Sequence, residues 1–114
     1  MTQPKIAVAK VGTHTVVSLL ESVTYQNSGD IEARLQAVIG RNQIALILEC
    51  KEVGFLDSAA LEMLLRTQGV LQERGCLMKI VSLNAVCRDI LIATRLINQF
   101  HVYPDMQEAI RETS

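Results

Sequence analysis

The amino-acid sequence predicts a single α/β domain with a mixed β-sheet, opened by an antiparallel hairpin and covered by about four helices packed mainly on one face. Three observations support this fold class. Two strand-like segments come first, separated by Gly12-Thr13. From Ile44 onward, strand-like segments alternate with amphipathic segments, which favours parallel strands and right-handed crossovers. The length of 114 residues suits one domain (1–114) and is too short for two.

The predicted hairpin comes from the first 20 residues. Apolar residues alternate with other types from Lys5 to Val11, and β-branched residues are frequent from His14 to Leu20. Gly12-Thr13 between these segments is a turn signal. The two segments are therefore predicted to pair as antiparallel strands, and a loop at 21–27 follows them.

A helix is predicted after this loop. Asn27 or Ser28 can cap it, and Asp30 and Glu32 suit the positive end of its dipole. Its apolar stripe, at positions i, i+4, i+7 and i+8, consists of Ile31, Leu35, Val38 and Ile39. Gly40 is expected to end the helix.

The middle of the chain predicts a central strand and a second helix. Ile44 to Cys50 is an apolar run, which is typical of a strand covered on at least one face. The helix is predicted from about Ser58 to Arg74, with Gly75 as its stop signal. Its core face consists of Leu61, Leu64, Leu65 and Leu71.

The last third of the chain predicts two further strands and two further helices. Cys76 to Leu83 is expected to be a strand, and Asn84 can cap the helix after it. The apolar face of that helix is predicted to consist of Val86, Ile90, Ala93 and Ile97. Phe100 to Tyr103 is expected to be a short strand, and Pro104 suits the first turn of a closing helix through Glu112.

Composition argues against several classes of function. The net charge of −1 and the scattered basic residues give no footprint for nucleic acid. The apolar runs are far shorter than the roughly 20 residues of a membrane-spanning helix. The N-terminus lacks the order of a signal peptide, so we expect a cytoplasmic protein without direct membrane insertion.

No metal or cofactor is expected from the cysteine and histidine pattern. Cys50, Cys76 and Cys87 are too widely spaced for a metal or redox motif, and we expect them to be reduced, buried thiols. His14 and His101 have no carboxylate or cysteine at ligand spacing. Both are interpreted as strand residues.

The segment from Val53 to Leu61 joins a loop after a buried strand to a helix start at Asp57-Ser58. In α/β sheets, binding sites gather where loops leave the carboxyl ends of strands. The first turn of a helix offers unpaired N–H groups and partial positive charge, so a phosphate on Ser58 would be stabilised there. From chemistry alone a second interpretation remains, in which these two residues only cap the helix.

This segment, with the sequence VGFLDSAAL, resembles the signature of the STAS family, the sulfate-transporter and anti-sigma-factor-antagonist domains. Members share an apolar residue, a short loop, Asp-Ser or Asp-Thr, two small residues and leucine. The resemblance extends over nearly the whole chain, from the strand at 44–50 to the closing helix. Two places differ: Ala59 and Ala60 stand where the family often has Ser-Gly, and Glu21 to Thr24 replaces a Gly-x-Leu-Asp-like turn.

The resemblance implies a regulatory function. In the family, the serine at the position of Ser58 is phosphorylated by a partner serine kinase that also acts as an anti-sigma factor, and a phosphatase removes the phosphate. The unmodified domain binds the kinase and thereby frees a sigma factor. Carried over, Ser58 is the phosphate acceptor, and Asp57 helps to position its hydroxyl. The expected partner-binding residues are Phe55, Asp57, Ser58, Ala59, Ala60 and Met63. Phe55 and Met63 have an equal alternative as core residues.

Two other functions remain to be compared with this one. An enzyme would need a nucleophile with a base, paired acids or a metal cluster. The sequence has no Gly-x-Ser-x-Gly elbow, no P-loop and no histidine close to Ser58, so we expect no enzyme activity. The second alternative is a STAS subunit of a lipid or anion transport complex. Such a subunit would contact its ATPase through Ser58 without being phosphorylated.

Overall fold

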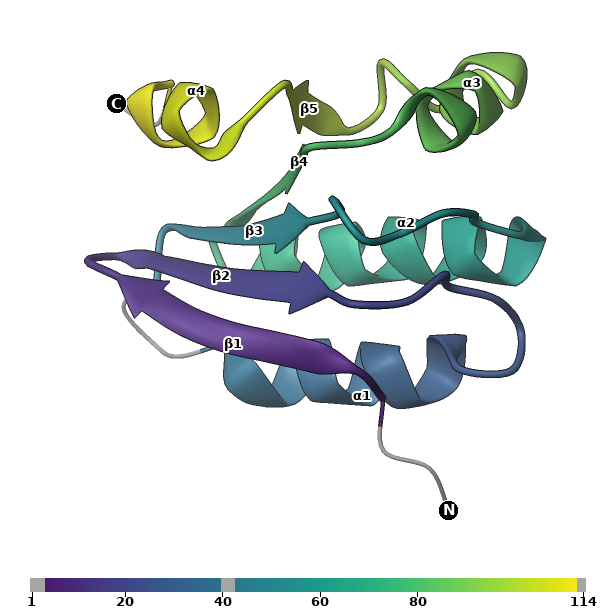
Figure 1. Ribbon diagram of the computed structural model, residues 1–114. Coiled ribbons are helices and arrows are strands. Elements are labelled where there is room, and N and C mark those ends of the chain that lie inside the picture. Colours follow the sequence, from purple (N-terminus) through teal and green to yellow (C-terminus); the bar gives the residue numbers. More distant parts are fainter. Residues whose placement is uncertain (1–3, 40–42, 113–114) are drawn as a thin grey trace.

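The computed structural model describes residues 4–39 and 43–112, and it confirms the predicted order of elements (Figure 1). The strands are β1 (Ile6–Val11), β2 (His14–Leu19), β3 (Ala45–Glu49), β4 (Leu77–Val81) and β5 (His101–Tyr103). The helices are α1 (Ser28–Val38), α2 (Ser58–Glu73), α3 (Ala85–Ala93) and α4 (Met106–Arg111). The strands form one sheet in the order β1-β2-β3-β4-β5. The β1–β2 pair is antiparallel and the other pairs are parallel, as predicted.

A two-residue turn sets the hairpin of β1 and β2. Val11 pairs with His14, so only Gly12 and Thr13 lie between the strands. Gly12 has a φ of +63°, which residues with a side chain rarely adopt and which the first position of a type II′ turn requires. From this turn the pairing continues without interruption to Ile6.

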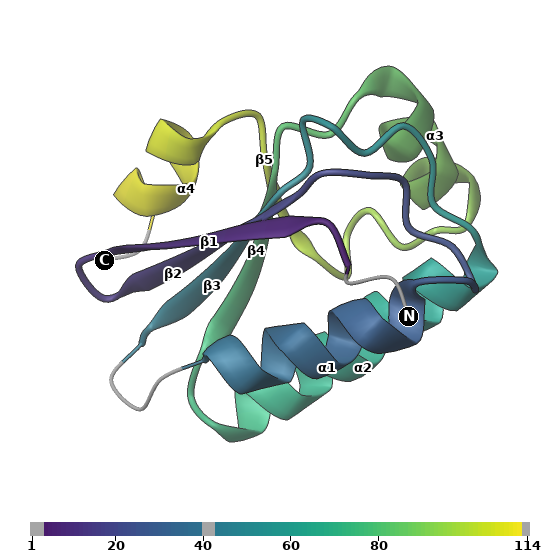
Figure 2. The ribbon, with the colours of Figure 1, turned by 60° about the horizontal axis from the view of Figure 1, so that its bottom comes forward.

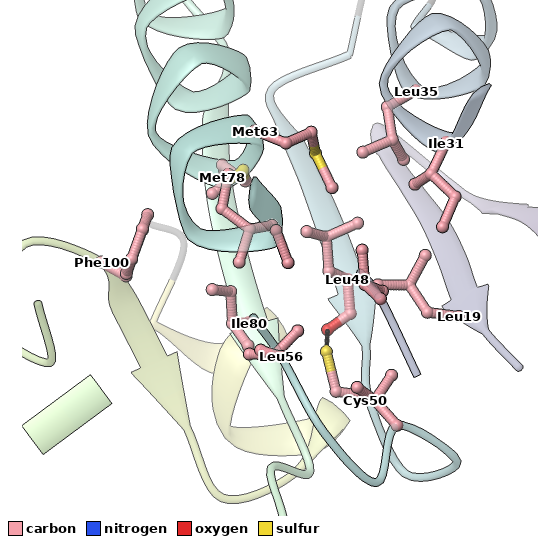
Figure 3. Close-up of a cluster of buried hydrophobic side chains, with 14 of the residues drawn as sticks. Leu19, Ile31, Leu35, Leu48, Cys50, Leu56, Met63, Met78, Ile80 and Phe100 are labelled. Atoms are coloured by element: carbon pink, nitrogen blue, oxygen red, sulfur yellow. Dashed lines mark hydrogen bonds between the residues drawn. The ribbon is translucent and has the colours of Figure 1, made fainter. Parts of the chain in front are cut away.

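Three helices bury their apolar sides against one face of the sheet. Figure 3 shows this core, to which Leu48 of β3, Ile80 of β4, Leu35 of α1 and Met63 of α2 all contribute. Figure 2 shows α1 and α2 side by side on this face. Cys87 of α3 belongs to the same buried cluster. The prediction that the helices pack mainly on one face is therefore confirmed.

Helix α4 lies on the opposite face of the sheet (Figure 2). There Val16, Ile47 and Val81 pack against Ala109. Lys79 of β4 is also buried on this face, where its Nζ donates to the main-chain oxygen of Ala109. The ammonium therefore meets a carbonyl near the C-terminus of α4, the end at which the helix dipole favours positive charge. The same Nζ lies 5.3 Å from the centroid of the Tyr103 ring.

Two predicted helix signals hold in the structure. The Oδ1 atom of Asn84 accepts from the main-chain N–H of Cys87 at 2.8 Å, which is the predicted cap of α3. Gly75 ends α2 with a φ of +73°. Its N–H donates to Gln72, and the N–H of Cys76 donates to Leu71, the paired pattern that closes a helix after a left-handed residue.

The start of α1 differs from the prediction. Asn27 occupies the cap position, but its side chain makes no cap hydrogen bond. Instead its Oδ1 accepts from the N–H of Thr24, and its Nδ2 donates to the oxygen of Ser22. The side chain therefore orders the preceding loop, because a short polar side chain can satisfy nearby main-chain groups as readily as a helix end. Gly40, predicted to end this helix, lies outside the described residues.

The closing helix also starts differently. α4 begins at Met106 and ends at Arg111. Asp105 caps it, with Oδ1 accepting from the N–H of Glu108 at 2.9 Å. Pro104 therefore lies before the cap and not in the first turn. The cap position is taken by Asp105, because its carboxylate can accept from an open N–H of the helix and a proline side chain has no acceptor.

The apolar face predicted for α3 is wrong in part, because Ile90 and Ile97 pack against the core but Val86 and Ala93 do not. Val86 is 53% exposed and Ala93 is exposed, whereas the helix buries Cys87 and Leu91. The fourth residue of the predicted stripe, Ile97, lies beyond the end of the helix. The rotation of α3 is fixed by tertiary contacts at its N-terminus, described below, and these override the spacing of its apolar residues.

Candidate functional site

Ser58 is the first residue of α2 and is exposed, as the sequence predicts. The loop that carries it leaves the carboxyl end of β3, one of the central parallel strands. Within the part of the chain that the structure describes, the Ser58 hydroxyl has no hydrogen-bond partner. The hydroxyl is thus available to another molecule at the positive end of a helix of 16 residues.

Asp57 holds the main chain around this serine. Its Oδ1 accepts from the N–H of Ala60 at 2.9 Å, which caps α2, and its Oδ2 accepts from the N–H of Tyr25 at 2.8 Å. The carboxylate therefore binds two main-chain amides from distant parts of the sequence. Among the described residues, no hydrogen bond joins Asp57 to the Ser58 hydroxyl, so its expected role in positioning that hydroxyl stays a prediction.

A second segment lies against the Ser58 loop. Val23 donates its N–H to the oxygen of Phe55 at 3.1 Å and accepts from the N–H of Asp57 at 3.3 Å. A parallel bridge between Val23 and Leu56 completes this contact. Tyr25, two residues further, is 74% exposed. The loop after β2 therefore presents an aromatic side chain beside the start of α2.

The start of α3 provides a third segment. The Nδ2 of Asn84 donates to the oxygen of Val53 at 3.0 Å, and the Sγ of Cys87 donates to the same oxygen at 3.3 Å. Val86 lies between these two residues and is exposed. Hydrogen bonds therefore join the segments 22–25 and 84–87 to the segment 53–58, which ends at Ser58. We call these three segments the switch surface.

The structure divides the predicted partner-binding residues into two groups. Phe55 is 47% exposed, Ser58 is exposed, and Asp57 and Ala59 are half-buried. Ala60 and Met63, in contrast, are fully buried, and Met63 lies in the core shown in Figure 3. For Met63 the alternative of a core residue holds. Neither Ala60 nor Met63 can touch a partner in this conformation, because α2 turns both side chains toward the sheet.

Sequence reasoning missed Tyr25 and Val86 as members of the switch surface. Tyr25 is in a segment that predicts only a loop, and Val86 was assigned to the buried stripe of α3. Both places depend on hydrogen bonds between residues about 30 positions apart in the chain, such as Asn84 to Val53. The one available signal for the first segment was its position, because Glu21 to Thr24 stands where many members of the resembled family carry a Gly-x-Leu-Asp-like turn.

A polar hollow of about 480 Å³ lies next to the switch surface. Its lining consists of Pro4, Glu21, Ser22, Thr24, Gln26, Asn27 and Asp30. Glu21 accepts through Oε2 from the N–H of Lys5 at 3.0 Å. Ser22 and Thr24 belong to both the hollow and the switch surface, so the two are continuous.

Among the described residues, no hydrogen bond joins the Ser58 hydroxyl to an activating base. His14 begins β2, at the end of the sheet opposite to the Ser58 loop, and His101 begins β5. The same residues contain no group of three or more side chains that could hold a metal ion. The three cysteines are free and buried, as predicted, and burial raises the pKa of each thiol. Across 4–39 and 43–112, the helices are too short or too polar to span a bilayer.

Comparison with known proteins gives a family match. The family model of the STAS domain matches residues 5–109. An anti-sigma factor antagonist from Mycobacterium paratuberculosis has a similar structure, with a TM-score of 0.83, 23% identity, and coverage of 94% of this chain and 91% of that one. The anti-sigma factor antagonist SpoIIAA in its unphosphorylated form gives a TM-score of 0.76 and 16% identity, with 93% of each chain covered.

Proteins of another kind share the fold as well. A sulfate transporter family protein from Wolinella succinogenes gives a TM-score of 0.78 and 14% identity, covering 90% of this chain and 86% of that one. A search of the curated proteins finds no match. At these identities the solved structures establish the fold alone, whereas the family model spans the chain from the hairpin to α4, including the Ser58 loop. The chain belongs to the STAS domain family.

Proposed function

We propose that this chain is a cytoplasmic anti-sigma factor antagonist, a single regulatory domain that binds a serine kinase acting as an anti-sigma factor. Phosphorylation of Ser58 switches the binding off, and a phosphoserine phosphatase restores it. The observation that carries this proposal is the exposed hydroxyl of Ser58, which has no hydrogen-bond partner among the described residues and lies at the start of α2 on the switch surface. The likeness to solved antagonists supports the same assignment.

The switch works through charge. The kinase transfers the γ-phosphoryl group of ATP to the Ser58 Oγ: the new O–P bond forms, the bond to the bridging oxygen of ATP breaks, and ADP leaves. The hydroxyl proton passes to a base of the kinase, because the neighbouring Asp57 carboxylate already accepts from the main-chain amides of Ala60 and Tyr25. The phosphate adds about −1.5 to −2 charges next to the Asp57 carboxylate.

The unmodified switch surface suits a protein partner. Phe55, Tyr25 and Val86 expose apolar side chains around a neutral serine. Aromatic residues of this kind often anchor protein interfaces. A phosphate introduced among them would be left without a partner when the interface closes, and burying an unpaired charge costs binding free energy. The domain therefore acts as a binding module and not as an enzyme.

The first test is phosphorylation in vitro. The wild-type protein is incubated with ATP and the serine kinase encoded beside it or found in the same regulatory system, and intact mass and peptide mapping follow. We expect one phosphate on the wild type and none on Ser58→Ala. Ser22→Ala is the matched control, because Ser22 lies on the same surface, and it should be phosphorylated like the wild type. Equal phosphorylation of Ser58→Ala would show that the assignment is wrong.

Binding to the same kinase tests the switch itself. Ser58→Ala should keep the affinity of the wild type, measured by calorimetry. Ser58→Asp should bind at least about tenfold more weakly, which corresponds to roughly 1.4 kcal/mol. Unchanged affinity of Ser58→Asp would show that negative charge at this position does not switch off binding to the kinase.

A second function is favoured by the likeness to the sulfate transporter family protein. In this alternative the chain is a STAS subunit of a lipid or anion transport complex, and Ser58 contacts the ATPase without modification. Native protein isolated from cells distinguishes the two functions. A phosphate at Ser58 favours the antagonist. An unmodified Ser58 in a chain that copurifies with a transporter ATPase favours the subunit.

A further inference from the structure

The sheet has one long edge that the described helices leave open. β1 has six residues and ends the strand order, whereas β5 at the other end has three. In Figure 2, β1 runs along the front of the sheet, with α1 and α2 below it and α4 above. Every residue from Ala7 to Val11 is exposed. An edge strand of this kind presents a row of unpaired N–H and C=O groups.

The pairing with β2 identifies these groups. The N–H of Leu20 donates to the oxygen of Lys5 at 3.0 Å, so these two residues form a hydrogen-bonded pair of the antiparallel ladder. Such pairs recur at every second residue, which turns the main-chain groups of the odd-numbered β1 residues toward β2. The outward-facing main-chain groups are those of Ile6, Val8 and Lys10.

This edge has few of the features that usually prevent strands from associating. Natural edges are protected by proline, bulges, charged side chains (lysine above all) or a covering element. β1 contains no proline, its register shows no bulge, and Lys10 is its single charged residue. Val8 is 39% exposed and Val11 is 51% exposed. The strand therefore offers apolar side chains together with open hydrogen-bonding groups.

We propose that β1 pairs antiparallel with β1 of a second copy of this chain, with the two-fold axis at Val8. In this register Val8 lies opposite Val8 of the second copy, and Ile6 lies opposite Lys10. All outward-facing groups of the strand then find partners. A register centred on Lys10 would place two like charges opposite each other, whereas this one separates the two lysines by roughly 14 Å along the strand.

The pairing has consequences for strength and arrangement. One strand pair buries less surface than the 1,200 to 2,000 Å² that is roughly usual for stable complexes, so the dimer is weak and depends on concentration. Two-fold symmetry makes the interface the same on both copies. Because the paired strands run in opposite directions, the two switch surfaces lie at opposite ends of the joined sheet, and both stay open. This last point rests on the proposed function, but the pairing itself does not.

Sedimentation velocity tests the dimer with a matched pair of variants. The wild type should shift from monomer toward dimer as its concentration rises to about 1 mM. Val8→Lys places two like charges face to face on the axis and should stay monomeric. Val86→Lys makes the same change at a comparably exposed position on α3 and should dimerise like the wild type.

Three results would overturn the proposal: a wild type that stays monomeric at the highest concentration, a Val8→Lys variant that still dimerises, or loss of the dimer in Val86→Lys. Loss of the dimer in Val86→Lys would indicate that two copies contact each other through the switch surface and not through β1. Circular dichroism and urea unfolding of Val8→Lys establish that it is folded.

Hydrogen exchange locates the contact within the chain. As the concentration of wild type rises, the amides of Ile6, Val8 and Lys10 should become slower to exchange. Those of Ala7 and Ala9 should be protected at every concentration, because they already pair with β2. Protection that rises with concentration at other residues, and not at these three, would contradict the proposed pairing through β1.

Discussion

At the scale of single residues, the geometry around Ser58 depends on Asp57. One carboxylate oxygen caps α2 through Ala60, and the other holds the N–H of Tyr25, which lies 32 residues earlier in the chain. Hydrogen bonds from main-chain amides to a carboxylate are stronger than those between neutral groups. One side chain thus starts the helix that presents the serine and fixes the loop beside it.

The two roles of Asp57 can be separated by substitution. Asp57→Ala removes both hydrogen bonds and should lower the free energy of unfolding by about 1–2 kcal/mol. Asp57→Ser keeps an oxygen that can cap α2 but has no second oxygen for Tyr25, so it should recover part of that loss. Urea unfolding measures both variants, and the Tyr25 amide should exchange faster in each. If Asp57→Ala is as stable as the wild type, the two bonds contribute nothing.

Residue patterns predicted the local role of Asp57 but not its distant one. Asp-Ser before an apolar helix is a cap signal, and the structure confirms the cap. The bond to Tyr25 has no local signature, because the two residues meet only when the sheet brings their loops together. Asn27 shows the opposite case: the cap pattern is present, but the side chain bonds to Ser22 and Thr24 instead. A short polar side chain has several main-chain groups in reach, and sequence alone does not choose among them.

At the scale of elements, α2 divides its residues between the core and the switch surface. Leu64 is almost completely buried, as the predicted stripe requires. Leu64→Ala should therefore lower the free energy of unfolding by about 2–5 kcal/mol, through lost burial and a cavity. Glu62→Ala, exposed on the same helix, should change stability by less than about 0.5 kcal/mol. Both are measured by urea unfolding; a loss of partner binding in Leu64→Ala without a loss of stability would mean that this face has been misidentified.

The contrast between α2 and α3 shows where helix periodicity is informative. α2 has 16 residues and a continuous apolar stripe, and the structure buries three of the four predicted core residues, Leu61, Leu64 and Leu71. α3 has nine residues, and Val86, Cys87, Ile90, Leu91 and Ile92 place apolar side chains around most of its circumference. Spacing alone then fits more than one rotation. The hydrogen bonds of Asn84 and Cys87 to the Val53 oxygen decide between them.

At the scale of the whole molecule, the buried thiols make the free energy of unfolding depend on pH in the alkaline range. Burial raises the pKa of each cysteine above its ordinary value of 9.0, most clearly for Cys50, where Cys87 and Glu49 add to the effect. The folded state thus keeps protons that the unfolded chain loses. Stability from this source is complete below pH 9 and falls above it, by up to about 1.4 kcal/mol per pH unit for each thiol.

Unfolding by urea between neutral pH and about pH 10 measures this dependence. The wild type should lose stability above pH 9, and Cys50→Ala should lose it less steeply. Lys79 acts in the other direction, because burial lowers its pKa from the ordinary value of 10.5 against the opposing charge of Glu112. Lys79 is present in both proteins, so the difference between them isolates Cys50. Identical slopes would mean that this thiol does not titrate differently on unfolding.

The direction of strand pairing was predictable, whereas the strand order was not predicted and the covering of the sheet was predictable only in part. Alternating strands and helices after β2 imply parallel pairing, but they do not fix the order β1-β2-β3-β4-β5. The sequence does not indicate that α4 covers the opposite face. Lys79, in the middle of β4, reads as a sign of an exposed position. Its burial depends on the carbonyl of Ala109, which becomes available only when α4 is in place.

The positions of the two tyrosines make the protein its own optical probe. The chain has no tryptophan, so Tyr25 and Tyr103 dominate its fluorescence. Tyr25 stands in solvent beside Ser58, and Tyr103 lies next to the Lys79 ammonium under α4. A phenylalanine at one of these positions leaves a single emitter. In Tyr103→Phe, the fluorescence of Tyr25 then reports changes near Ser58. In Tyr25→Phe, the fluorescence of Tyr103 reports whether α4 is packed on the sheet.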